Sequence, residues 1–232
     1  MPHMSIESWP DRKYVMSKPM PALLPHIRRV ITSHNASGVA IAGNNTLVPS
    51  EAMDIVPGAR GATMWVVEDG LPTAENVGEL CADSTQRRVH NPENFDLVPP
   101  CGANLRSTEL APGASTAMHR TSSLDYNILV AGELVLITAD GAETRLSTPG
   151  DTVVQRGTLH AWRNPSATQW TRWVSVLLAA EPAIAGGATL PPVFIDAVEE
   201  VSVPTSAPAA VAARNVRARP GDRAQTPSEV GA

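Results

Sequence analysis

The chain has 232 residues, of which 43% are hydrophobic and 18% are charged, and its formal net charge is −5. This length suits one packed domain with terminal extensions. The acidic balance and the scattered arginines argue against a nucleic-acid partner. No apolar run reaches the roughly 18 to 20 residues that cross a bilayer, and the N-terminus has no apolar signal-peptide core. We therefore expect a cytoplasmic protein without a membrane segment.

The 21 prolines and 16 glycines indicate many turns and few long helices, so an all-β fold is expected. Residues 1–24 mix Pro, Ser, Lys and Met without periodicity, which is typical of a mobile N-terminal arm. Residues 183–232 form a C-terminal extension that we expect to be largely disordered, because its Pro- and Ala-rich sequence cannot bury enough apolar surface.

Between these ends, residues 25–182 contain short apolar runs bounded by Gly, Pro, Asn or Asp, the pattern of a β-barrel. The predicted strands are Ile27–Thr32, Val39–Ala42, Thr63–Val67, Asn104–Leu110, Tyr126–Val130, Glu133–Thr138, Thr152–Gln155 and Trp170–Leu178. Turn residues around Gly132, Gly141 and Gly150 predict the hairpins of its second half. Residues 69–101 are instead expected to form a long loop, which in a compact domain is often a functional lid.

Two sequence motifs carry the more specific information. Residues 113–132 read GASTAMHRTSSLDYNILVAG and residues 150–164 read GDTVVQRGTLHAWRN. The first resembles the first cupin motif, with Gly113, His119 and Gly132 at matching positions. The second resembles the second cupin motif, with one residue fewer after its opening glycine and with His160 at the histidine position. The chain is thus similar to small single-domain cupins of bacterial and fungal biosynthetic clusters, which implies a double-stranded β-helix, or jelly-roll, barrel.

The first motif also departs from the family's pattern. Thr121 stands where metal-binding cupins have a second histidine, and Asp125 stands where they have glutamate. A site of three histidines and one glutamate is therefore excluded. What remains is His119, Asp125 and His160, the composition that non-heme iron enzymes use as metal ligands.

The same three residues can also work without a metal. An imidazole and a carboxyl group are a general acid and base near neutral pH, and side chains two residues apart on a strand share a face. We predict His119, Asp125 and His160 as catalytic residues. Thr121 shares a strand face with His119, Asn127 with Asp125, and Trp162 with His160. These three neighbours are predicted to contact the substrate.

Two candidates lie outside the motifs. Arg106 precedes the first motif on a predicted strand and offers its guanidinium to an anionic or enolate oxygen. Trp65 belongs to an apolar run on which either Met64 or Trp65 faces the interior. Both Arg106 and Trp65 are counted as candidate substrate-binding residues.

Three functions remain open from the sequence. The first is an enzyme of secondary metabolism that dehydrates, isomerises or cyclises an enolisable polyketide-like or aromatic substrate by acid and base chemistry. The second is a metal-dependent oxygenase in which His119, Asp125 and His160 bind one divalent ion, Fe, Zn, Mn or Ni. The third is a ligand-binding barrel without catalysis. The expected partners are a small-molecule substrate and, as the cupin resemblance implies, a second copy of the chain, with Ile27–Thr32 covering its sheet edge.

Overall fold

The computed structural model describes residues 21–76, 89 and 94–195, and all statements about structure refer to these. Most of the predicted N-terminal arm, the middle of the predicted long loop and residues 196–232 of the predicted extension lie outside them. The named elements of the described part are all strands. They are β1 (Ile27–His34), β2 (Ala40–Val48), β3 (Glu51–Ala52), β4 (Ala59–Val67), β5 (Ala103–Leu110), β6 (Met118–Arg120), β7 (Ser123–Ala131), β8 (Leu134–Thr138), β9 (Glu143–Leu146), β10 (Thr152–Arg156), β11 (His160–Arg163), β12 (Thr171–Ala179), β13 (Ile184–Ala185), β14 (Ala188–Thr189) and β15 (Val193–Ile195).

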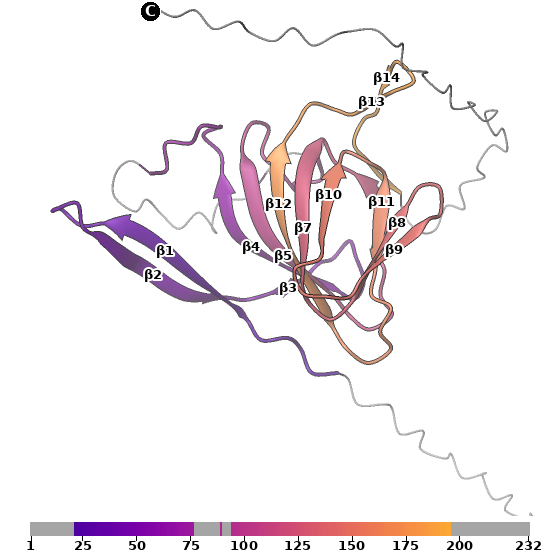
Figure 1. Ribbon diagram of the computed structural model, residues 1–232, viewed down its shortest axis with the longest axis horizontal. Helices are drawn as coiled ribbons and strands as arrows, with labels where there is room; N and C mark the ends of the chain where they lie inside the picture. The colour runs from indigo at the N-terminus through magenta and orange to yellow at the C-terminus, as the bar shows by residue number, and fades with distance from the viewer. Residues whose placement is uncertain (1–20, 77–88, 90–93, 196–232) are drawn as a thin grey trace, which may run out of the picture. The chain divides into compact units, whose positions relative to one another are not determined.

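Two antiparallel sheets form the barrel (Figure 1). The strand order is β10-β7-β12-β5-β4-β3 in the six-stranded sheet and β15-β6-β11-β8-β9 in the five-stranded sheet. Strands that are distant in the sequence lie side by side, as β12 does between β5 and β7. This crossing order is that of a jelly roll, so the all-β barrel expected from the sequence is present.

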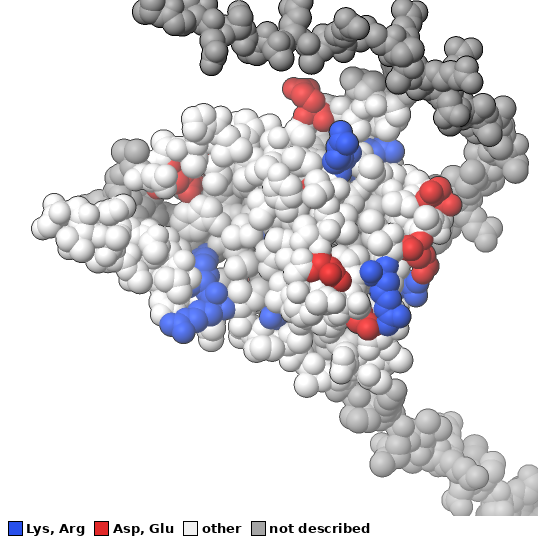
Figure 2. Space-filling model, viewed as in Figure 1, with Lys and Arg blue, Asp and Glu red and all other residues white. Residues whose placement is uncertain are grey.

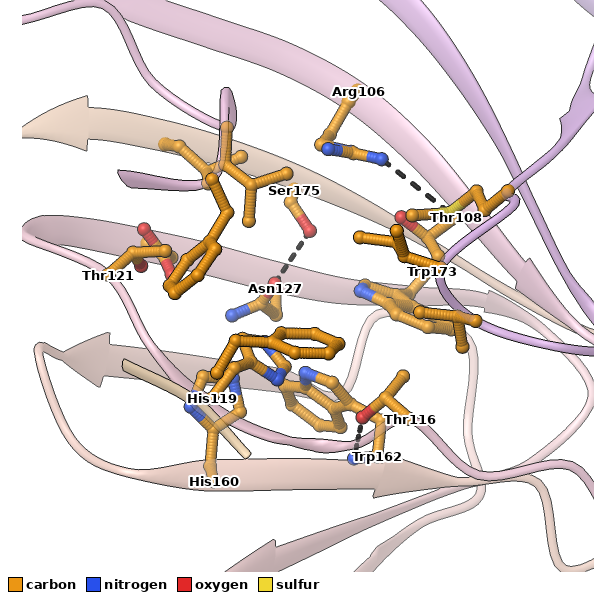
Figure 3. A pocket seen from close by; sticks show the side chains of 18 residues that line it. Arg106, Thr108, Thr116, His119, Thr121, Asn127, His160, Trp162, Trp173 and Ser175 are labelled. Atoms are coloured by element: carbon orange, nitrogen blue, oxygen red, sulfur yellow. Dashed lines mark hydrogen bonds between the residues drawn. The ribbon is translucent and has the colours of Figure 1, made fainter. Parts of the chain in front are cut away.

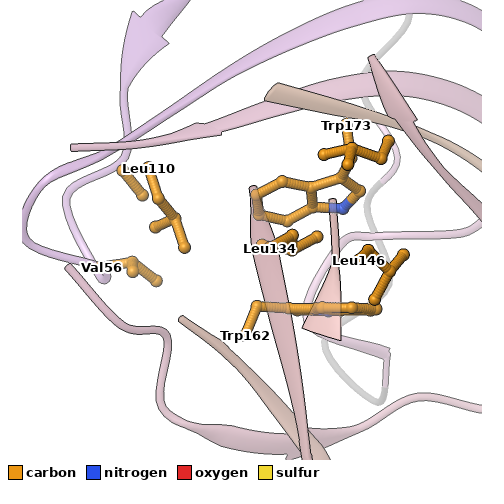
Figure 4. Close-up of a cluster of buried hydrophobic side chains, with 8 residues drawn as sticks. Val56, Leu110, Leu134, Leu146, Trp162 and Trp173 are labelled. Atoms are coloured by element: carbon orange, nitrogen blue, oxygen red, sulfur yellow. The ribbon is translucent and has the colours of Figure 1, made fainter. Parts of the chain in front are cut away.

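The barrel core lies between the two sheets. Trp173 from β12 packs against Trp162 from β11, with ring centroids 5.7 Å apart. Leu110, Leu129 and Leu134 belong to the same cluster and are almost completely buried. Figure 4 shows Leu134 beside the two tryptophans. Burial of this much apolar surface is the main source of stability for the sandwich.

The N-terminal hairpin lies outside the barrel sheets. β1 and β2 pair only with each other, in a two-stranded sheet, whereas the expected barrel begins at residue 25. Their turn is stabilised by Asn35, whose side-chain oxygen accepts hydrogen bonds from the amides of Ser37 and Val39. Arg29 links the hairpin to the barrel by donating to the carbonyl of Met64, at 3.0 Å.

The five-stranded sheet extends beyond residue 182, where the sequence analysis ends the barrel. β15 pairs with β6, and Phe194 lies opposite His119 in the register. The short apolar run Val193–Ile195 therefore contributes an edge strand, because the exposed edge of β6 offers backbone groups that need partners. Within the described residues, no helix has the length and hydropathy of a transmembrane span.

Candidate active site

A cavity opens between the two barrel sheets, beside the tryptophan pair. Its volume is about 90 Å³. On the same measure a single water needs roughly 10–15 Å³, so the space suits a small organic molecule. The apolar part of its lining includes Met53, Phe95, Trp162, Trp173 and Phe194. Polar side chains enter from both sheets.

His119 and His160 form a pair on the five-stranded sheet. They are direct cross-strand partners on β6 and β11, and their ring centroids are 4.3 Å apart (Figure 3). Nδ1 of His119 lies 2.9 Å from the carbonyl oxygen of Ala117, and Nδ1 of His160 lies 3.0 Å from that of Thr158. A carbonyl only accepts, so Nδ1 carries the proton in both rings and Nε2 is the basic nitrogen.

Burial keeps both imidazoles neutral. Desolvation, with a smaller effect from the neighbouring His119, lowers the pKa of His160 to about 3, against the opposing hydrogen bond to Thr158. The pKa of His119 is also lowered, first by desolvation and less by the positive charge of Arg106, against the opposing hydrogen bond to Ala117. The cavity therefore contains two unprotonated Nε2 atoms at neutral pH.

Asp125 reaches the cavity from the other sheet. It lies on β7, is 5% exposed, and its Oδ1 is buried without a hydrogen-bond partner. Desolvation raises the pKa of Asp125 to about 6, although a hydrogen bond from Ser123 opposes the shift. Thr121 also lines the cavity and shares a 2.7 Å hydrogen bond with the same Ser123. The cavity thus has a carboxyl group that takes up a proton near pH 6.

Asn127 and Arg106 belong to one cross-strand row of the six-stranded sheet. Ser175 on β12 lies opposite both of them, and all three side chains line the cavity. The hydroxyl of Ser175 donates to Oδ1 of Asn127 at 2.6 Å. The barrel thereby brings together all the polar residues that the sequence analysis predicted for the site.

The two predicted tryptophans have different positions. Trp162 lines the cavity, and its ring meets His160 edge-on with centroids 5.5 Å apart. Trp65 is not part of the cavity lining, and its indole donates to Glu75 at 2.7 Å. A β-bulge between Thr63 and Trp65 changes the register of β4 and places Trp65 opposite Leu105, next to the inward-facing Arg106 on β5.

The three candidate metal ligands do not form one coordination group. His119 and His160 lie on one sheet and Asp125 on the other. Among the residues that the structure describes, no three His, Cys, Asp or Glu side chains come close enough together to hold a metal ion. The residues present therefore do not fit a site of two histidines and one carboxylate.

Several lining residues were missed by the sequence reasoning. Phe194 packs on His119 and on Phe95, with ring centroids 6.4 and 5.5 Å apart. Phe95 comes from the end of the predicted long loop, and Phe194 from the predicted disordered extension. The apolar run Val193–Ile195 was the available signal for the latter, and Trp173 was recognisable only as part of a strand.

Comparison with known proteins identifies the family. No protein-family model matches the chain. It is 31% identical over 179 residues to the cupin-domain-containing oxidoreductase virC of Hypocrea virens, covering 74% of this chain and 84% of that protein. The chain belongs to the cupin superfamily. This cupin also resembles the phomopsin biosynthesis cluster protein C' of Diaporthe leptostromiformis, with 35% identity over 66% of this chain and 79% of the relative.

A solved structure with a similar arrangement is that of the polyketide cyclase RemF from Streptomyces resistomycificus. The similarity covers 64% of the cupin chain and 80% of the neighbour, with 16% identity and a TM-score of 0.39. Similarity at this level carries no information about the reaction.

Proposed function

We propose that this cupin is an enzyme of secondary metabolism that acts by proton transfer on an enolisable polyketide-like or aromatic substrate. The observation that carries the proposal is the division of the cavity's titratable groups. Two neutral imidazoles lie on the five-stranded sheet, and a carboxyl group with a raised pKa lies on the six-stranded sheet. A base and an acid on different walls can act on two atoms of one bound molecule.

The base belongs to the histidine pair. Nε2 of His119 or His160 removes a proton from a carbon next to a carbonyl group, and the electron pair of the broken C–H bond forms an enolate. The hydrogen bonds from Nδ1 to the backbone hold both rings in the tautomer that this step requires.

Asp125 supplies the acid. In its protonated form, which predominates below about pH 6, it gives its proton to a departing hydroxyl group, which leaves as water in a dehydration, or to another carbon in an isomerisation. The proton on the histidine then returns to Asp125 through solvent, so the enzyme is regenerated. Relatives named for fungal biosynthesis clusters support a role in secondary metabolism.

Exchange of carbon-bound protons tests this proposal. We expect the protein to accelerate deuterium uptake at the methylene group of phenylpyruvate or phenylacetone in D₂O, measured by NMR. At least one of His119→Ala and His160→Ala should slow the catalysed exchange by roughly 10²-fold or more, the usual contribution of a general base. His34→Ala removes an exposed histidine of β1 and should leave the rate unchanged.

The proposal fails if His119→Ala and His160→Ala exchange protons at the wild-type rate. It also fails if the wild-type protein accelerates neither compound. Saturable binding of the compounds without any exchange would instead support a barrel that binds ligands without catalysis.

A metal-dependent oxygenase is the second candidate, and the name of the relative from Hypocrea virens, an oxidoreductase, supports redox chemistry but says nothing of a metal. The described residues offer two imidazoles on one sheet but no third ligand beside them. Metal analysis of the purified protein, together with turnover after chelation and under anaerobic conditions, tests this candidate. Stoichiometric metal and activity that needs both metal and oxygen would favour it over proton transfer.

A further inference from the structure

Arg106 is a cation in the cavity wall without a counter-ion among the described residues. Its Nε is buried with no hydrogen-bond partner, and the contact of its Nη2 is the weakly accepting Sδ of Met53, 3.8 Å away. Burial lowers the pKa of Arg106, which reflects the cost of holding this charge away from water. By contrast, Arg172, which is buried on β12, is paired with Glu109. Arg106 is only partly exposed, and an unpaired guanidinium shielded from water is unfavourable unless something else supplies the negative charge.

Asp125 does not supply that charge. It faces Leu177 across the strands, whereas Arg106 faces Ser175, so the two charged groups lie in different rows of the sheet. Its raised pKa, with no contribution from Arg106, agrees with this separation.

Asn127 provides a second unused donor in the row of Arg106. Ser175 lies between them and donates to Oδ1 of Asn127, which fixes the orientation of the amide. Nδ2 of Asn127 is then left buried without a partner. Two unsatisfied donor groups, separated by one strand on the same face, are suited to an anionic oxygen pair.

The remaining lining restricts the kind of anion. Trp162, Trp173 and Phe194 provide apolar and aromatic walls, and the cavity volume is about 90 Å³. Figure 3 shows Arg106 on the side of the cavity away from His119 and His160, with Asn127 and Ser175 between them. A group of one negative charge attached to a flat apolar body fits this arrangement better than a phosphate, which needs more donors.

We propose that the cavity binds a carboxylic acid with an aromatic body, and that Arg106 and Asn127 hold its carboxylate. This inference rests on the proposed function, because it identifies the substrate of the proposed proton transfer as an enolisable aromatic carboxylic acid. With the carboxylate at Arg106, the body of the molecule extends toward the histidine pair. Binding of the acid also neutralises the positive charge that lowers the pKa of His119, so the bound substrate strengthens its own base.

Calorimetric titration of the full chain at pH 8 with phenylacetate and phenylacetamide tests this inference. The two probes have nearly the same shape, and only the first has a charge. We expect wild type to bind phenylacetate at least roughly ten-fold more tightly. Arg106→Met should reduce phenylacetate affinity by roughly ten- to hundred-fold and abolish the preference, as loss of a charged hydrogen-bonding group does. Arg106→Lys, which keeps the charge but not the planar fork, should have an intermediate affinity.

Further variants separate the carboxylate site from the proposed catalysis. Asn127→Ala should weaken phenylacetate binding by less than Arg106→Met does. Arg156→Met, at an exposed position on β10, should behave as wild type. His119→Ala should keep the preference for phenylacetate, because the histidine is not part of the carboxylate site.

The inference is overturned if wild type does not prefer phenylacetate, or if both Arg106→Met and Arg106→Lys keep the wild-type preference. A loss of binding in Arg106→Met counts in its favour when the variant retains the wild-type circular dichroism spectrum and unfolding temperature. If Arg106 governs phenylacetate binding but the histidine variants exchange protons normally, the proposed function fails and the carboxylate site stands. If instead the histidine variants lose proton exchange but Arg106→Met binds phenylacetate as wild type does, the proposed function stands and the carboxylate site is refuted.

Discussion

At the scale of single residues, burial shifts the pKa values of the cavity groups in opposite directions. His160 and His119 lose affinity for protons, whereas Asp125 gains it, because in each case the charged form is the one that desolvation disfavours. His160 is mainly uncharged above about pH 3 and Asp125 is mainly uncharged below about pH 6, so both groups are neutral between these two values. The cavity is a place where neutral acid and neutral base coexist, which water alone does not provide.

Asp125 makes the stability of the fold depend on pH. The pKa of its carboxyl group is about 6 in the folded chain and near 3.8 when exposed. Because the pKa is raised on folding, the contribution of this group to the free energy of unfolding is fully present below about pH 4. That contribution is lost as the pH rises through 6. The shift corresponds to about 3 kcal/mol at pH 8. Asp125→Asn should therefore be more stable than wild type in urea unfolding at pH 8, by up to about that amount, and close to wild type at pH 4.

Asp151 provides a control of opposite sign. Backbone hydrogen bonds from Thr148 and Ser147 lower the pKa of its exposed carboxyl group, so the ionised form stabilises the turn. Asp151→Asn should be less stable than wild type at pH 8. A stability difference for Asp125→Asn that is the same at pH 4 and pH 8 would contradict the assignment of the raised pKa.

At the scale of elements, the motif glycine Gly132 has a packing role in the turn between β7 and β8. Its φ is +74°, and a Cβ at this position would lie 2.7 Å from the carbonyl oxygen of Trp170 and 3.0 Å from Cα of Thr171. The glycine thus lets the β7–β8 turn approach the start of β12. Gly141, in the next turn, has a similar φ of +82° but open space around the position of a Cβ.

The pair of glycines allows a direct comparison. Gly141→Ala should cost about 1 kcal/mol, the usual cost of the left-handed conformation for alanine. Gly132→Ala should cost roughly 2 kcal/mol more, because backbone atoms must also move. Urea unfolding of both variants measures the difference. Equal losses of stability in the two variants would show that close packing at Gly132 is unimportant.

At the scale of the whole molecule, two groups of apolar side chains are exposed on the part of the chain that the structure describes. On the hairpin β1–β2, Val30 and Leu47 are exposed on one face, which they share with Arg28 and Asn45, and Leu47 is 64% exposed. On the outer face of the six-stranded sheet, Tyr126, Val130 and Val154 are exposed. Figure 2 shows charged side chains in small separate groups with broad uncharged areas between them. An isolated hairpin is only marginally stable in water, so a covering surface would stabilise it.

We expect the chain to form a homodimer in which the hairpin of each copy covers the outer sheet face of the other. Each chain carries both the hairpin and the sheet face, so a two-fold axis forms this contact twice. Leu47→Asp and Val154→Asp should each shift the protein toward monomer in sedimentation velocity at tens of micromolar. Ile184→Asp, at a 72% exposed position between β12 and β15, should leave the dimer unchanged. A wild-type protein that sediments as a monomer would refute this prediction.

Much of the barrel was predictable because its causes are local. Six of the eight predicted runs lie on strands of the two barrel sheets, since alternating apolar residues and Gly or Asn turns act within a few positions of one another. The histidine pair followed from two motifs at known spacing. The hairpin β1–β2 has equally good local signals, but nothing in its sequence says whether it joins a barrel sheet.

The sequence by itself determined the all-β class, the cupin motifs and the chemical groups of the site, because residue type, alternation and turn residues are properties of the chain. The tertiary structure decided which groups meet. It placed Asp125 across the cavity from the histidines, turned Trp65 away through a bulge, and brought Phe194 beside His119. These outcomes depend on register and on the packing of one sheet against the other, and a one-residue change in register exchanges the inward and outward faces of a strand.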